Sequence, residues 1–185
     1  MGYYTSLAAL KSFGSFESPS DDVLLNALIA SASESIDGHC QTTFSSSEES
    51  DHTFTRLNIA GLSNPFSGNI LLLDADLAAV PSAITDSPTV VCLPENRFPI
   101  FALVLTDGAW NSTAVVITGH WAYSISPPPD IEIACLRLAK WMYDLRDTSQ
   151  GAAVIVTPEG RVLLPQGLPS DIVTFLAPYK RVRVA

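Results

Sequence analysis

Charged residues and cysteines are both scarce in this chain of 185 residues. Only 16% of the residues are charged, against about 25% in a typical soluble protein, while 47% are hydrophobic. The three cysteines, Cys40, Cys92 and Cys135, lie far apart, and no CxxC pair or zinc-ribbon spacing occurs. We therefore expect buried thiols in a reducing compartment, and neither a disulfide framework nor a zinc site.

Long apolar runs are also missing. The longest candidates, around residues 100–105 and 114–118, have the length of a strand and fall short of the roughly 18 residues of a membrane-spanning helix. The first ten residues lack the basic segment and the long apolar core of a secretory signal. We expect neither a membrane-spanning segment nor a membrane partner.

Basic residues are few and unevenly placed. The chain carries 10 Lys and Arg against 19 Asp and Glu, a net charge of −9. Residues 1–136 hold 3 basic and 15 acidic residues, a net −12, whereas residues 137–185 hold 7 basic and 4 acidic residues, a net +3. So acidic a chain repels phosphates, which argues against nonspecific binding to nucleic acid or to an anionic membrane. The basic excess gathers near the C-terminus in Lys180, Arg181 and Arg183.

Helical patterns occupy both ends of the chain. Thr5 is a suitable N-cap for a short helix that Gly14 would close, and Ser20 is a suitable N-cap for a longer one. In the longer helix apolar residues repeat at helical spacing, and Gly38 is expected to mark its end. A third helix follows three prolines, with acidic residues first and basic residues last, as the helix dipole favours. We predict four helices, near residues 5–14, 20–40, 130–146 and 170–177.

Between these helices the pattern changes to that of short strands. Apolar or β-branched runs are separated by turn signals such as Asp107-Gly108. This spacing predicts a small antiparallel sandwich or barrel. Trp110, just after that turn signal, is expected at the tip of a loop. The candidate strands are residues 70–73, 83–85, 89–93, 101–105 and 114–119.

The predicted fold class is α+β, a small helical bundle with an inserted antiparallel β module and a C-terminal hairpin and tail. The bundle core would take residues 1–44 together with residues 127–150, and the β module residues 51–125. The remaining residues, 151–185, would form a hairpin, a short helix and a contact tail. In that hairpin residues 154–156 and 161–164 would flank the turn of residues 157–160.

Catalytic motifs are absent from the sequence. We find no GxSxG nucleophile elbow and no phosphate-binding GxxxxGK or GxGxxG motif. His39 adjoins Cys40, but neighbouring residues of a helix point about 100° apart and rarely ligate one metal ion. We therefore predict no catalytic residue, no cofactor, no metal ligand and no enzymatic activity.

Two alternatives from other functional classes stay open. Asp74 and Asp76 are two residues apart, so a strand would place both carboxylates on one face, as an acid pair or a two-metal enzyme requires. A solvated strand end explains the same spacing. Trp110 on a loop would suit a carbohydrate-binding β module.

Three segments, in this order, carry a resemblance to a known family. The first is SDDVLLNALI at residues 20–29, continuing to SIDGHC at residues 35–40. The second is ITGHWAY at residues 117–123, followed by three prolines and the third predicted helix. The third is LPSDI at residues 168–172, continuing to LAPYKRV at residues 176–182. The pattern resembles the head-tail connector, or adaptor, proteins of tailed bacteriophages, in their long form with an inserted β module. Ala122 departs from it, since related sequences often have glycine after the tryptophan.

This resemblance implies a structural protein of the virion. Such proteins form a ring, usually of twelve copies, between the portal of the DNA-filled head and a stopper or tail protein. The expected partners are copies of the chain itself, the portal, the stopper and the DNA that passes through the channel without sequence-specific binding. Assembly in the host cytoplasm would precede a place at the head-tail interface.

The composition agrees with such a role. Surplus apolar residues suit contacts between ring subunits, and an acidic body lets DNA pass without gripping phosphate. The family's C-terminal segment tends to reach the portal. Carried onto this chain, the resemblance implies a portal contact formed by Pro178, Tyr179, Lys180, Arg181, Val182, Arg183 and Val184.

Overall fold

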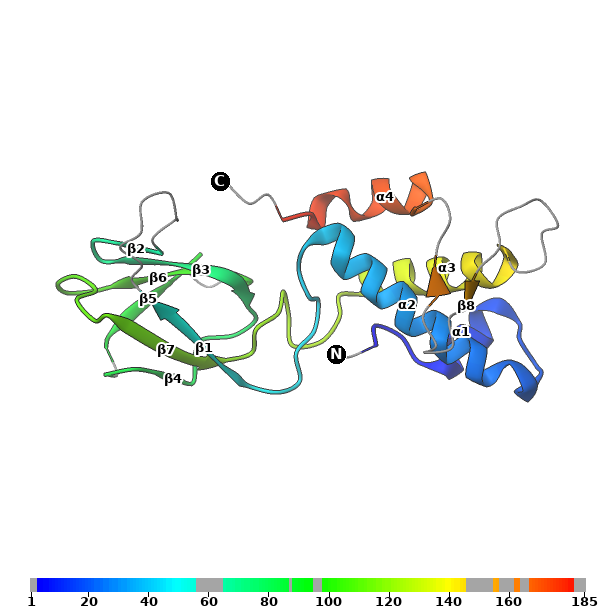
Figure 1. The fold of residues 1–185 in the computed structure, drawn as a ribbon, viewed down its shortest axis with the longest axis horizontal. Coiled ribbons are helices and arrows are strands. Elements are labelled where there is room, and N and C mark those ends of the chain that lie inside the picture. Colours follow the sequence, from blue (N-terminus) through cyan, green and yellow to red (C-terminus); the bar gives the residue numbers. More distant parts are fainter. Residues whose placement is uncertain are drawn as a thin grey trace. The chain divides into compact units, whose positions relative to one another are not determined.

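The chain forms two compact units of the predicted α+β class (Figure 1). A computed structural model describes residues 3–55, 65–86, 88–94, 98–145, 155–156, 162–163 and 167–181. The helical unit combines residues 1–41 with residues 127–181, and the β unit comprises residues 42–126. The helical unit is therefore built from both ends of the chain, with the β unit inserted between them.

Helix α1 (Leu7–Gly14) begins one residue later than its predicted cap implies. The Oγ of Ser6 accepts a hydrogen bond from the N–H of Ala9 at 3.2 Å, so Ser6 is the N-cap and the prediction of Thr5 is wrong. The left-handed residue that ends the helix is Ser15, with φ of 57°. Gly14 lies against the ring of Phe16, so a Cβ at this position would force the ring to move.

Helix α2 (Asp22–Cys40) follows a 3₁₀ turn, η1 (Pro19–Asp21). Ser20 lies inside this turn, so it is not the N-cap that the sequence suggested. The helix also continues past Gly38 and ends where Gln41 takes a left-handed conformation, with φ of 56°. A small residue in a helix is therefore a weak end signal when packing continues beyond it, and Cys40 is fully buried.

The remaining helices complete the helical unit. Helix α3 (Pro129–Leu145) packs against α1, α2 and α4 (Ser170–Leu176), and α4 runs into a second 3₁₀ turn, η2 (Ala177–Tyr179). All four predicted helices are present. The predicted hairpin strands are present too, as β8 (Ile155–Val156) and β9 (Val162–Leu163), paired antiparallel. The buried apolar residues that α2 and α3 contribute are Leu25, Leu28, Ile29, Ala32, Ile36, Cys40, Ile131, Ala134, Cys135, Leu138, Ala139 and Met142.

Two antiparallel sheets form the β unit, and their described strands do not close into a barrel. One has the order β1-β7-β4, from Ser50–Thr55, Ala114–Gly119 and Ala83–Ile84. The other has the order β2-β3-β6-β5, from Phe66–Ser67, Ile70–Leu77, Ile100–Leu105 and Val90–Leu93. The five predicted strands are present, whereas β1 and β2 were missed. Strand β1 reads SDHTFT with one buried residue, so it lacks the apolar alternation that marks a strand.

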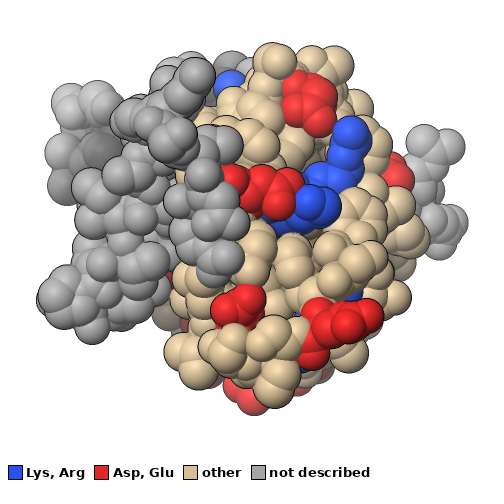
Figure 2. Space-filling model, turned by 90° about the vertical axis from the view of Figure 1, so that its right-hand side faces the viewer, with Lys and Arg blue, Asp and Glu red and all other residues tan. Residues whose placement is uncertain are grey.

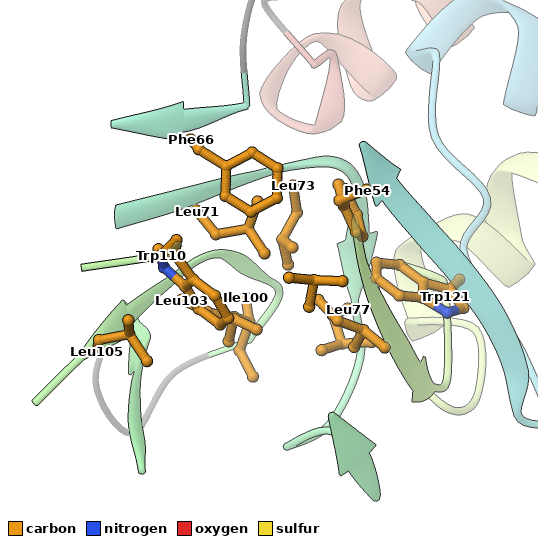
Figure 3. Close-up of a cluster of buried hydrophobic side chains, with 12 residues drawn as sticks. Phe54, Phe66, Leu71, Leu73, Leu77, Ile100, Leu103, Leu105, Trp110 and Trp121 are labelled. Atoms are coloured by element: carbon orange, nitrogen blue, oxygen red, sulfur yellow. The ribbon is translucent and has the colours of Figure 1, made fainter. Parts of the chain in front are cut away.

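Side chains from both sheets meet in one core (Figure 3). Phe54 of β1 and Ile117 of β7 share this cluster with residues of β3 and β6. The two sheets therefore stabilise each other, as in a sandwich. The other members are Phe66, Leu71, Leu73, Leu77, Ile100, Leu103, Leu105, Trp110, Val115 and Trp121.

Trp110 belongs to this core, which corrects its expected place at a loop tip. Only 4% of its surface is exposed. The predicted turn exists, with Gly108 at a φ of 79°. Beyond it the chain folds back, and the N–H of Trp110 donates to the carbonyl of Gly68 at 3.1 Å. Turn residues in a sequence locate a reversal but do not reveal which way the next side chain points.

The two passages of the chain into and out of the β unit are bonded to each other. The N–H of Tyr123 donates to the carbonyl of Thr43 at 2.8 Å, and the Oγ of Ser124 donates to the carbonyl of Phe44 at 2.9 Å. The rings of Phe44 and Tyr123 also pack, with centroids 5.5 Å apart. We call this arrangement the clasp.

The N-terminal segment is anchored on α2 by a buried tyrosine. Tyr4 is 2% exposed; its hydroxyl donates to the carboxylate of Asp37 and its N–H donates to the Oγ of Ser33 at 3.3 Å. Burial raises the pKa of Asp37 from 3.8 to about 6, and the neighbouring charge of Glu34 acts in the same direction, while the bond from Tyr4 opposes it. Asp37 thus ionises within the helical unit at an unusually high pH.

Replacement of Trp110 by alanine tests its place in the core. We expect Trp110→Ala to lower the free energy of unfolding by about 3–5 kcal/mol, because a large buried side chain is lost and a cavity remains. Denaturant unfolding followed by circular dichroism measures this. The exposed Val80→Ala in the same unit serves as control and should change the free energy by less than about 0.5 kcal/mol. A loss from Trp110→Ala no larger than that of the control would contradict the assignment.

A pH series tests the environment of Asp37. The raised pKa means that folding binds a proton, so the contribution of Asp37 to stability is present below its ordinary pKa of 3.8 and is lost as the pH rises through about 6. We expect wild type to lose thermal stability relative to Asp37→Asn between about pH 4 and pH 7. Melting temperatures across this range measure the difference, with the exposed Glu17→Gln as control. Parallel curves for wild type and Asp37→Asn would show that the carboxylate is not destabilised by burial.

Candidate functional site

The C-terminal segment, residues 177–181, is held against the helical unit by polar contacts. The hydroxyl of Tyr179 donates to the Oδ2 of Asp130 on α3 at 2.9 Å. The N–H of Arg181 donates to the carbonyl of Cys40, at the end of α2, at 2.9 Å. The backbone of this segment is therefore positioned by two helices. Of the predicted contact residues, Val182, Arg183 and Val184 lie outside the described part of the chain.

Side chains of this segment differ in their exposure. Pro178 and Lys180 are exposed, whereas Tyr179 and Arg181 are half-buried. Helix α4, which leads into the segment, buries Ile172 and Leu176. The structure thus presents two predicted contact residues to solvent and uses the other two in part for packing.

Ion pairs neutralise other basic residues of the helical unit. Lys11 lies 2.6 Å from Asp22, Arg137 lies 3.3 Å from Asp171, and Lys140 lies 2.7 Å from Asp144. In the described part of the face drawn in Figure 2, basic and acidic side chains lie next to each other among a majority of uncharged residues. These exposed pairs contribute little stability, but they leave no broad basic surface in that view. In the C-terminal segment two basic residues, Lys180 and Arg181, are adjacent in the sequence.

The β unit is strongly acidic. Residues 42–126 carry 8 acidic and 2 basic residues, a net −6. Seven of the acidic residues are described and both of the basic residues, Arg56 and Arg97, are not. The described acidic residues are Glu48, Glu49, Asp51, Asp74, Asp76, Asp86 and Asp107.

Asp74 and Asp76 share the outward side of β3 but have different surroundings. Leu73, Ala75 and Leu77 take the core-facing positions between and beside them. Asp76 is 8% exposed and accepts a hydrogen bond from the Oγ1 of Thr42 at 2.7 Å. The Asp74 side chain is 78% exposed, and its Oδ1 lies 3.9 Å from the Nδ1 of His52. Asp76 is thus a buried carboxylate and Asp74 an exposed one.

The three cysteines lie in surroundings that disfavour the ionised thiolate. Burial raises the pKa of both Cys40 and Cys135 to about 11, and it raises that of Cys92 as well, so all three thiols stay protonated at neutral pH. None of these three cysteines is therefore a thiolate nucleophile at neutral pH.

The described residues contain no group of three or more His, Cys, Asp or Glu that would hold a metal ion. None of the described helices has the length and apolar character that crossing a bilayer requires.

Sequence reasoning missed an apolar surface on the sheet β2-β3-β6-β5. The register of its three longer strands places six aliphatic residues on the outward side, and Leu72 on β3 is 51% exposed. The unbroken apolar run Ile70-Leu71-Leu72-Leu73 could have revealed this surface, because a strand with one solvated face alternates polar and apolar residues.

Comparisons with known proteins gave matches among solved structures. No protein-family model and no curated protein matches the chain. A chain from the neck of an empty gene transfer agent particle, computed with C6 symmetry, is similar with a TM-score of 0.60 and 15% identity, over 98% of this chain and 92% of that chain. A chain from the neck of the native particle, computed with C12 symmetry, is similar with a TM-score of 0.55 and 18% identity, over 100% and 96%. A chain from the virion of the native particle gives 0.57 and 16%, over 98% and 92%.

These likenesses span both units of the chain and almost the full length of each neighbour. At 15–18% identity they establish the fold. The helical unit with its inserted β unit is therefore the fold of chains found in the necks of gene transfer agent particles.

Proposed function

We propose that the protein is a structural head-tail connector of a tailed phage or a phage-like particle. The observation that carries this proposal is the end-to-end likeness to neck chains, which includes the inserted β unit as well as the helices. The segments that resemble head-tail connectors lie in α2, in the passage from β7 to α3, and in α4 with η2. Sequence pattern and fold thus both favour a structural role. The proposed protein has no catalytic activity and takes its place in the virion after assembly in the host cytoplasm.

The proposed assembly is a ring of identical subunits, with twelve copies as the expected number. A neighbour with this fold comes from a neck computed with C12 symmetry, which supports that number. A closed ring requires two different contact surfaces on every subunit, so each copy must bury apolar area beyond its own core. Exposed large hydrophobic residues are available for this in both units, including Val23, Leu72 and Phe101.

The ring would surround the path of the DNA. A net charge of −9 for each copy supports this, because a channel wall that lacks clustered Lys and Arg does not release counterions from DNA and does not retain it. The β unit, at −6, carries most of that charge. DNA would therefore pass without sequence-specific contacts.

The C-terminal segment would contact the portal, and the opposite side of the ring would receive the stopper or a tail protein. Support comes from the positive charge of Lys180, Arg181 and Arg183, at the end of an otherwise acidic chain. Basic side chains at the rim of an interface attract an acidic partner and increase the rate of association. The bonds from Tyr179 and Arg181 to the helical unit would hold the start of this segment in place.

Mass measurement tests the ring. We expect native mass spectrometry and negative-stain imaging to show a closed ring, about twelve times the 19.8 kDa of one chain, for the protein alone or mixed with its portal. A monomer in both samples at all concentrations would refute the connector proposal.

Charge reversal tests the portal contact. We expect the triple variant Lys180→Glu, Arg181→Glu, Arg183→Glu to bind the portal about tenfold more weakly or worse, because three attractive charges become repulsive. Binding is measured by surface plasmon resonance at low and high salt. The control is Lys140→Glu, at an exposed ion pair of α3, which should leave affinity within about twofold. Equal affinity for wild type and the triple variant would exclude this segment from the contact.

A further inference from the structure

The outward face of the sheet β2-β3-β6-β5 is apolar where its three longer strands are paired. In register, Ile70 lies opposite Val104, and Leu72 lies opposite Ala102. Val91 lies opposite Val104 on the other side of β6, and Leu93 lies opposite Ala102. Directly paired residues share a face of the sheet, so these side chains form one surface. We call it the sheet patch: Ile70, Leu72, Val91, Leu93, Ala102 and Val104.

This surface is distinct from the core of the β unit. The alternate residues of the same strands, such as Leu71, Leu103 and Cys92, face the core cluster. Strands with one face in a core usually carry polar residues on the other face. Here both faces are apolar, which is the pattern of a sheet covered on both sides.

Exposure and boundaries of the sheet patch fit an interface. Leu72 is 51% exposed, Ile70, Val91, Leu93 and Val104 are half-buried, and the small Ala102 is 1% exposed. Asp74, two residues after Leu72 on the outward side of β3, borders the patch with an exposed carboxylate. An apolar centre with a polar rim is typical of a surface that another protein covers.

We propose that the sheet patch is a subunit contact of the ring and that a second copy of this chain covers it. This inference rests on the proposed function. The charge of the β unit favours this location, because two copies at −6 each repel one another wherever their acidic surfaces meet. The six residues of the sheet patch carry no charge, so a neighbouring copy can pack there without juxtaposing carboxylates.

Symmetry defines the kind of contact. A patch that packs against the same patch of a second copy closes as a dimer, whereas a ring needs two different surfaces in contact. The sheet patch therefore packs against another surface of the neighbouring subunit, and each copy uses it once.

Two charge insertions test this contact. We expect Leu72→Glu and Val91→Glu each to reduce the fraction of protein in rings by about tenfold or more, because the glutamate would be buried without a partner. The matched control is Thr55→Glu, an exposed position of β1 in the other sheet, which should assemble like wild type. Native mass spectrometry measures the rings, and circular dichroism verifies that each variant is folded.

The outcomes separate this inference from the proposed function. If wild type forms rings and the folded Leu72→Glu and Val91→Glu variants form them equally well, the sheet patch is not a subunit contact. If wild type forms no ring even with its portal, the proposed function fails and this inference fails with it.

A photo-crosslinking residue in place of Leu72 identifies what covers the patch. We expect a covalent product of two copies in the assembled ring, and little such product from the same residue in place of Thr55. A crosslink from position 72 to a portal or tail protein, or to another part of the same chain, would overturn the assignment to a second copy.

Discussion

The packing of α2 against α3 is the constraint on which the rest of the structure depends. These helices form the centre of the helical unit, yet residues 41–128 separate them in the sequence. Closing a flexible loop costs conformational entropy that grows slowly with length, by about 0.6 kcal/mol for each doubling. An inserted segment that folds on its own core removes most of that freedom before the helices meet. The sandwich core around Leu71, Leu103 and Ile117 thus makes the contact between α2 and α3 less costly.

Apolar residues in this chain consequently serve three separate tasks. One set joins the four helices and a second set joins the two sheets, as the separate compact units require. A third set, the sheet patch, lies on the side of its sheet that faces away from the core cluster. Only 16% of the residues are charged, and most of these are acidic. The exposed carboxylate of Asp74 lies beside the sheet patch, so a charged surface borders this apolar one.

The positions of the helices and of five strands were predictable from the sequence because they depend on local periodicity. The residue that ends or caps a helix was not, since Ser6, Ser15 and Gln41 compete with neighbours of nearly equal propensity. Trp110 was misplaced because its burial depends on a bond to Gly68, far away in the sequence. The same holds for Asp76, whose carboxylate looked like half of an acid pair until its bond from Thr42 was visible. Contacts between distant segments, and not residue types, decided these cases.

The clasp between Thr43 and Tyr123 joins the two ends of the β unit. Because these ends are neighbours, the unit is inserted in the helical unit like a domain inserted into a loop. Such an inserted domain can be shortened, exchanged or deleted by changes at two neighbouring points of the chain, and the packing of α2 against α3 does not change. The β unit can therefore change while the helical unit keeps its own structure.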